Sequence, residues 1–174
     1  NNISDPEIAR LMLQAESAFR SGYYNAALSI ADSAISLNPK LADIYFLKGR
    51  VLTKLSRFAE AEDAYFQVIS LDDKYQGAWF NIGTNNLRQN KTPQAIYNYY
   101  NEMNEHPSAQ TMVQIGKAYS DLGKADSALL SYEKAIQINS NLAPAYMRLS
   151  HLKKDAGEIV EAINHAKKGI ELEP

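Results

Sequence analysis

The sequence predicts an all-α protein, a solenoid of five stacked helix pairs. The first observation is an alanine that recurs at separations of 34, 34, 33 and 34 residues, at Ala27, Ala61, Ala95, Ala128 and Ala162. The second is that the same step relates three glycines and three tyrosines, at Gly49, Gly83, Gly116, Tyr65, Tyr99 and Tyr132. A fixed period of this length is typical of units that cannot bury their apolar faces alone and must stack on their neighbours.

Cutting the chain at this period predicts an N-terminal arm at residues 1–7 and a single array at residues 8–174. The five units are expected at residues 8–41, 42–75, 76–108, 109–142 and 143–174. Each unit holds two amphipathic helical patterns separated by a turn. The turns carry glycine or a small polar residue, which suits the end of a helix. They are expected at Ser21-Gly22, Ser56-Arg57, Asn90-Lys91, Leu122-Gly123 and Ala156-Gly157.

The second helices have recognisable ends. In the third unit Thr92 is expected to cap the helix, with Pro93 in the first helical position, where its missing N–H costs nothing. Asn38-Pro39 and His106-Pro107 are expected to stop the second helices of their units, because the residue before proline disfavours helical geometry.

The recurring small residues have a packing reason. The glycines of the first helices are expected to leave room for the second helix of the same unit, and the alanines of the second helices make the same close approach from the other side. A bulky side chain at either position would overpack the seam. The large residues expected to fill the core are aromatic: Tyr45, Trp79, Tyr146, Tyr65, Tyr99 and Tyr132.

Composition excludes several classes of function. The chain has 174 residues, a net charge of −2 and no cysteine. No apolar run approaches the roughly 18 residues needed to cross a bilayer, so no membrane insertion is expected of this segment. A near-neutral charge gives no reason to expect nucleic acid, and the absence of cysteine removes disulfides and thiolate sites.

No catalytic constellation is present in the sequence. The histidines at positions 106, 151 and 165 lie apart and lack a companion acid at catalytic spacing. The prediction is therefore a protein that is not an enzyme, with no catalytic residue, no metal ligand and no cofactor. Because the chain begins at Asn1 without an initiator methionine, it is expected to be a processed or excised piece. Its compartment stays open between the cytoplasm and the bacterial periplasm or envelope.

The repeated residues resemble a known family. Two units carry the pattern most clearly: Tyr45, Gly49, Phe58, Ala61, Tyr65 and Val68, then Met112, Gly116, Tyr119, Ala128, Tyr132 and Ala135. This pattern resembles the tetratricopeptide repeat (TPR) family over residues 8–174. The resemblance implies a right-handed superhelix of antiparallel helix pairs, whose first helices line a concave groove that usually holds a peptide or partner segment.

The family's groove-facing positions can be carried over to this numbering. The fifth positions of the units are all apolar: Met12, Phe46, Phe80, Val113 and Met147. They form either an open hydrophobic track for a partner or packing between adjacent first helices. At the sixth position Asn81, Gln114 and Arg148 could hold an extended peptide backbone. The predicted partner-binding residues are Phe46, Arg50, Phe80, Asn81, Gln114, Lys117, Met147 and Arg148.

Charge favours one kind of partner for this groove. Its polar positions hold seven basic residues, among them Arg50, Lys117 and Arg148, and four acidic residues. A net charge of about +3 on this surface favours an acidic or carboxylate-bearing protein segment. The family's lysine-based carboxylate clamp is not matched, because the fifth positions carry no lysine.

Two other functions remain open. The last helix would turn Ala162, Ile163, Ala166, Ile170 and Leu172 toward a missing neighbour, which predicts self-assembly into a homo-oligomer through this end. Alternatively, the array is the docking arm of a longer multidomain protein.

The third unit departs most from the repeat. It has Glu102 where its neighbours have Val68 and Ala135, and Glu105 in place of an aliphatic residue. The favoured interpretation is a weakly packed, irregular junction before the fourth unit. A cation site made by Glu102, Glu105 and His106 is the alternative.

Overall fold

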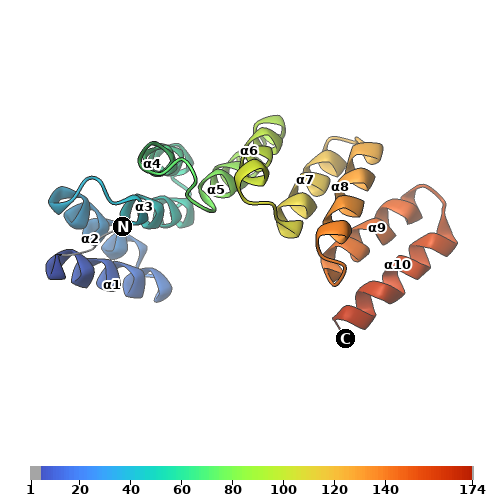
Figure 1. Cartoon of the computed structure of the whole chain (residues 1–174), viewed down its shortest axis with the longest axis horizontal. Coiled ribbons are helices and arrows are strands. Elements are labelled where there is room, and N and C mark those ends of the chain that lie inside the picture. The colour runs from blue at the N-terminus through green and yellow to red at the C-terminus, as the bar shows by residue number, and fades with distance from the viewer. Residues whose placement is uncertain (1–4, 174) are drawn as a thin grey trace. The chain divides into compact units, whose positions relative to one another are not determined.

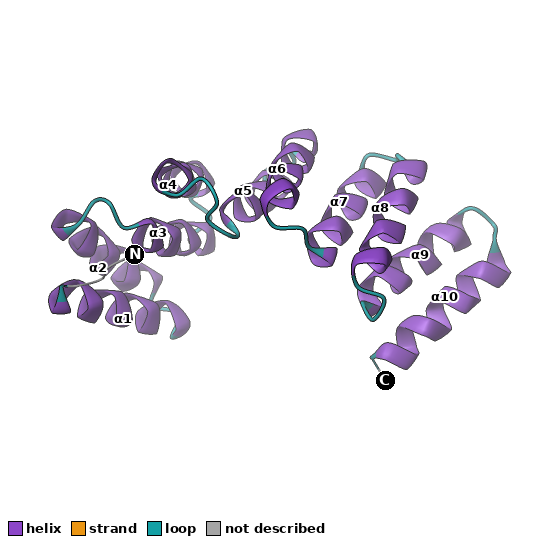
Figure 2. Ribbon diagram, viewed as in Figure 1, coloured by secondary structure: helices purple, strands orange, loops and turns teal. Residues whose placement is uncertain are grey.

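The computed structural model describes residues 5–173, and over that range the chain consists of helices joined by short loops, with no strand (Figures 1 and 2). The helices are α1 (Pro6–Arg20), α2 (Tyr24–Leu37), α3 (Ala42–Lys54), α4 (Phe58–Leu71), α5 (Ala78–Arg88), α6 (Thr92–Glu105), α7 (Ala109–Asp121), α8 (Ala125–Ile138), α9 (Ala143–Asp155) and α10 (Ile159–Leu172). Two of them fall in each predicted unit. The all-α fold of repeated helix pairs is confirmed.

The first helix begins earlier than the repeat suggested. The Glu7 backbone N–H donates to Asp5 Oδ1 at 2.8 Å, so Asp5 caps α1. Pro6 follows the cap, where the absence of an N–H is tolerated. Residues 6 and 7 of the predicted arm are therefore helical, and residues 1–4 lie outside the described range.

The turns within the helix pairs follow the prediction. Gly22, Gly123 and Gly157 have φ of 80°, 70° and 80°, and Ser56 and Asn90 each have φ of 59°. This left-handed conformation ends a helix at little cost for glycine and at some cost for serine. The sharp turn between paired helices is therefore a property of all five repeats.

The predicted cap of α6 is wrong. Lys91 occupies the N-cap position without a side-chain capping bond, and Thr92 and Pro93 are the first two helical residues. The Lys91 carbonyl already accepts the first helical hydrogen bond, from the Ala95 N–H at 3.0 Å. The predicted stops are confirmed, since α2 and α6 end directly before Asn38-Pro39 and His106-Pro107.

The chain divides into two compact units, residues 1–85 and 86–174, and the boundary falls inside α5. In the first unit α1 packs on α2, α2 on α3, and α3 on α4. Its core holds Ala15, Ala27, Leu47 and Val51 in one cluster and Leu52, Ala61, Ala64, Tyr65 and Ile82 in another. In the second unit the packed neighbours are α6 and α7, α7 and α8, α8 and α9, and α9 and α10.

Each unit contains the same close seam between paired helices. A methyl group added at Gly49 would lie 2.6 Å from Tyr65 Cε1, and one added at Gly116 would lie 2.5 Å from Tyr132 Cε1. Both tyrosines are buried. The glycines thus make room for the tyrosine rings, and the predicted packing role is confirmed at these two positions.

Buried polar groups concentrate in the third repeat. In the first unit Asn85 is fully buried and exchanges hydrogen bonds of 3.0 and 3.1 Å with Thr53. In the second unit Asn98 Nδ2 donates to Asn86 Oδ1 at 2.8 Å, and Glu102 is buried. Across residues 5–173 no three His, Cys, Asp or Glu side chains gather as metal ligands would, so the cation-site alternative has no support.

Candidate functional site

A charged cavity opens in the second unit where α7, α8 and α9 meet. Its volume is about 300 Å³. From α7 it receives Lys117 and Asp121, and from α9 it receives Arg148, His151 and Asp155. Lys117 and Arg148 are predicted partner-binding residues, and the structure brings them together with Asp121, His151 and Asp155.

The helices direct these charges away from the core. Ile115 and Ala118 on α7 are buried, as are Ala145 and Leu149 on α9. The polar residues lie on the remaining part of each helix surface, where Lys117 is half-buried and the other four are exposed. None of the five forms an ion pair or a side-chain hydrogen bond with another residue of the described chain. Their charges are therefore available to a ligand.

A tyrosine hydroxyl completes the cavity wall. Tyr132 of α8 is buried, and its hydroxyl lies 3.4 Å from Ser120 Oγ. Burial raises the pKa of Tyr132 above its usual value, an effect that the nearby positive charge of Arg148 opposes. Tyr132 is therefore a neutral hydrogen-bonding group at neutral pH.

The predicted groove residue Arg50 lies in a different environment in the first unit. Its Nη1 lies 3.4 Å from Glu16 Oε2, and its guanidinium carbon lies 4.3 Å from the centre of the Phe19 ring. Glu16 also pairs with Arg20, at 3.3 Å. Arg50 therefore links α3 to α1 by an ion pair and a cation–π contact.

The apolar fifth positions mostly take part in packing. The Phe46 ring lies 5.7 Å from Tyr65 and 4.9 Å from Tyr75 between ring centres. Val113 is buried. Met147 is 37% exposed, and its Sδ would lie 2.7 Å from a methyl group added at Gly169. Of the two predicted alternatives, packing describes Phe46 and Val113.

Tyr75, which contacts the Phe46 ring, also forms a hydrogen bond with an acidic residue of α3. Its hydroxyl donates to Asp43 Oδ1 at 2.6 Å. Burial and this hydrogen bond raise the pKa of Tyr75 well above its usual value. The Asp43 carboxylate of the second repeat therefore accepts a hydrogen bond from within its own chain.

The predicted sixth-position residues differ in burial and in their hydrogen bonds within the chain. Asn81 Nδ2 donates to the carbonyl of Gly77, the residue directly before α5, at 2.7 Å, so part of its amide is already used. Gln114 is half-buried and Arg148 is exposed, and the fifth-position residue Phe80 is also half-buried. Of the three sixth-position residues, Arg148 alone is among the residues that line the charged cavity.

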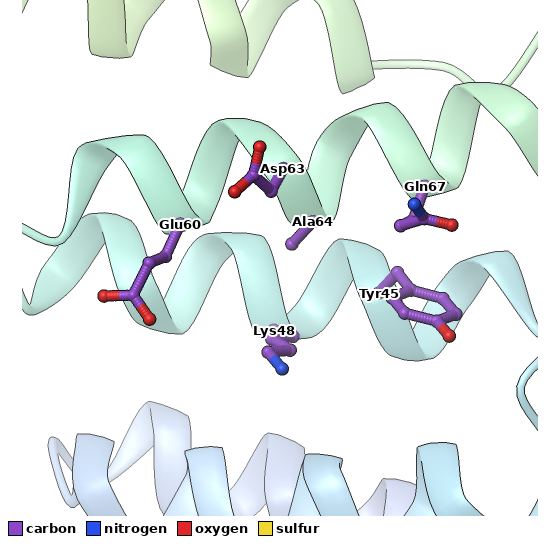
Figure 3. A pocket seen from close by; sticks show the side chains of 6 residues that line it. All are labelled: Tyr45, Lys48, Glu60, Asp63, Ala64 and Gln67. Carbon is purple, nitrogen blue, oxygen red and sulfur yellow. The ribbon is translucent and has the colours of Figure 1, made fainter.

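A second cavity, of about 220 Å³, lies between α3 and α4 of the first unit. Figure 3 shows the residues that line it, which are Tyr45 and Lys48 from α3 and Glu60, Asp63, Ala64 and Gln67 from α4. Lys48 Nζ pairs with Asp32 at 2.8 Å. Glu60 accepts from Arg57, a bond that lowers the pKa of Glu60. Two of its charges are therefore neutralised within the chain, which makes this cavity the weaker candidate.

The last helix presents apolar side chains to solvent. Ile163 is 49% exposed and Ile170 is 60% exposed, whereas Leu172 is half-buried. Ala162 was expected on this open face but is buried, because it is the recurring alanine that packs within the helix pair. No helix in residues 5–173 is long and apolar enough to span a membrane.

Sequence reasoning placed Tyr132 only in the core and did not foresee the polar contacts of Asn85. A signal was present in both cases. The three recurring aromatic residues of the second helices are tyrosines, which carry a hydroxyl that must find a partner. Asn85 occupies a register position where other repeats have Val51 and Ala118.

Comparison with known families agrees with the repeat architecture. Residues 109–142 match the tetratricopeptide repeat family, and residues 4–68 match the family of anaphase-promoting complex, cyclosome, subunit 3. The chain is similar to anaphase-promoting complex subunit 3 of Schizosaccharomyces pombe, with 22% identity over 151 residues, or 86% of this chain and 22% of that protein. The chain spans 16% to 22% of the length of the curated relatives it matches.

Solved structures share the fold at low identity. MamA from Desulfovibrio magneticus RS-1 has a TM-score of 0.83 and 16% identity, with 97% of this chain and 96% of that chain covered. YrrB, a TPR protein with an unusual peptide-binding site, has a TM-score of 0.71 and 17% identity, with 94% and 85% covered. The helix pairs and the glycine–tyrosine seams give this chain a tetratricopeptide-repeat fold, and residues 109–142 match that family.

Proposed function

We propose that this chain is a non-enzymatic scaffold that binds a carboxylate-bearing peptide or partner segment on the groove face of its second unit. The observation that supports the proposal is a cavity in which Lys117 and Arg148 have no ion-pair partner among the described residues. Tetratricopeptide repeats are in general scaffolds for protein–protein interaction.

The form of the cavity suits an extended segment better than a small metabolite. Its charged side chains lie on two first helices and are mostly exposed, so a ligand can run across the surface between them. Exposed ion pairs contribute about 1 kcal/mol or less each. Useful affinity therefore requires several contacts along a chain, which Gln114 and Tyr132 can extend by hydrogen bonding.

Affinity capture tests this proposal when the mutant and its control carry the same change of charge. The native protein, Lys117→Ala/Arg148→Ala and the control Lys134→Ala/Lys167→Ala would be used as baits, because the control removes two positive charges from the second helices. We expect a partner to be retained by the native protein and the control and lost from the groove variant. Equal retention by all three baits would contradict the proposed site.

Self-assembly is a second candidate, supported by the exposed Ile163 and Ile170 on α10. It predicts a mass that rises with protein concentration in sedimentation, and a rise that disappears in Ile170→Asp. A constant monomer mass at high concentration would exclude it. The groove proposal applies equally to a docking arm within a longer multidomain protein.

A further inference from the structure

The charges of the cavity are arranged in two bands across parallel helices. α7 and α9 are the first helices of successive repeats, and the repeat of 34 residues places His151 at the register of Lys117, and Asp155 at the register of Asp121. Arg148 lies one turn before His151. The first band is therefore Lys117, Arg148 and His151, and the second is Asp121 and Asp155.

The acidic band belongs to the last two repeats only. At the register position of Asp121 and Asp155, the first three repeats carry basic residues, Arg20, Lys54 and Arg88. The sign of this position thus reverses where the cavity occurs. Packing gives no reason for the reversal, because Asp121 and Asp155 are exposed.

The bands do not neutralise each other. Lys117 precedes Asp121 by four residues on α7, and His151 precedes Asp155 by four on α9. A base that precedes an acid at this spacing is the less favourable order for an ion pair along a helix. Neither pair forms in the described structure, so both signs face the cavity unpaired.

The spacing of Lys117 from Asp121, and of His151 from Asp155, matches the two-residue repeat of an extended peptide, and Arg148 lies one turn before His151. Four residues of helix advance by about 6 Å. In an extended chain, side chains two residues apart point to the same side and lie about 6.6 Å apart. We propose that the segment bound here carries an acidic residue and a basic residue separated by one residue, with the acid against Lys117 and Arg148 and the base against Asp121 and Asp155.

This inference rests on the proposed function and narrows it. A segment with two acids would set one of them against the acidic band, and a segment with two bases would set one against the basic band. Such like-charge contacts reject a ligand more effectively than attraction alone selects one. The cavity would therefore discriminate by the alternation of sign and not by net charge.

Four synthetic peptides with blocked ends test the inference: Gly-Asp-Ala-Lys-Gly, Gly-Lys-Ala-Asp-Gly, Gly-Asp-Ala-Asp-Gly and Gly-Lys-Ala-Lys-Gly. Each would be titrated into the whole chain while backbone amide signals are followed by NMR. We expect the two mixed-sign peptides to bind at least about threefold more tightly than the like-charged ones, with shifts at residues 117–125 and 148–156. Both mixed orders are included because an extended chain can bind in either direction.

Charge reversal sharpens the test. The variant Asp121→Lys/Asp155→Lys should bind Gly-Asp-Ala-Asp-Gly most tightly. The control Glu105→Lys/Glu133→Lys makes the same change in net charge away from the cavity and should bind the four peptides in the native order. If the native protein prefers Gly-Asp-Ala-Asp-Gly at these amides, this inference is overturned and the proposed function stands. If no peptide shifts them at all, both are overturned. The native ranking decides the matter even if the reversed variant does not fold.

Discussion

The two units of the chain use equivalent groove positions in different ways. In the first unit Arg50 is held by Glu16 and by the face of Phe19. In the second unit Lys117, at the same register, lines an open cavity without an ion-pair partner in the described structure. A groove charge can therefore stabilise the stack of helices or remain available to a ligand, and charge counting alone does not distinguish the two.

The largest effect should come from the glycine–tyrosine seam that is present in each unit. Gly49→Val and Gly116→Val force a side chain into the space of Tyr65 and Tyr132, and each should lower the free energy of unfolding by about 3 kcal/mol. Urea denaturation followed by circular dichroism measures it, with the exposed Ala59→Val as control. A loss in only one unit would show that the seams are not equivalent.

A smaller effect should follow from removing one partner of the buried amide in the first unit. Thr53→Val removes the hydroxyl that exchanges two hydrogen bonds with the Asn85 amide and should cost about 2 kcal/mol, whereas Thr53→Ser keeps the hydroxyl and should cost less. In the second unit, Asn98→Ala should have a comparable effect through Asn86. Equal stability of the valine and serine variants would mean that this hydrogen bond contributes little.

The arginines should separate stability from binding. Arg50→Ala loses an ion pair and a cation–π contact and should cost about 1 kcal/mol of unfolding free energy. Arg148→Ala loses no such contact within the described chain and should stay within about 0.5 kcal/mol of the native value. Thermal unfolding of the two variants side by side checks this difference. The reverse order would contradict the assignment of roles.

The smallest effect should appear at alkaline pH and in both units. Burial raises the pKa of Tyr75 in the first unit and raises the pKa of Tyr100 in the second unit to about 12, with a contribution from the Tyr119 hydrogen bond. The unfolded tyrosines ionise near pH 10. Their full contribution to the free energy of unfolding is therefore present below that pH, and it declines as the pH rises toward the pKa of each tyrosine in the folded state. Melting temperatures at pH 9 and pH 11 should show the decline. Tyr75→Phe and Tyr100→Phe should each reduce it, and an unchanged decline in both variants would argue against these groups.

The fold could be predicted from the sequence because the recurring residues are required by local steric constraints that each repeat shares. Glycine at Gly49 and Gly116 and the left-handed turns follow directly from the period. The cap of α6 was mispredicted because Thr92 has a side chain suited to capping but lies one residue after the N-cap position, inside the helix. Lys117 and Arg148 were predicted as partner-binding residues from their repeat positions, and both line the cavity. Their pairing was not predictable, because whether Arg50 meets Glu16 or Lys117 stays free depends on side chains from a neighbouring repeat.

The central claim is that partner binding occurs on the second unit and depends on Lys117 and Arg148. Site-specific photocrosslinking tests it most directly, with benzoylphenylalanine placed at His151 in one protein and at Phe46 in another, both exposed to source lysate. The account predicts a crosslinked partner from position 151 that disappears in the Lys117→Ala/Arg148→Ala background, and no such product from position 46. A partner captured equally from position 46, or one that survives the double substitution at position 151, would contradict it.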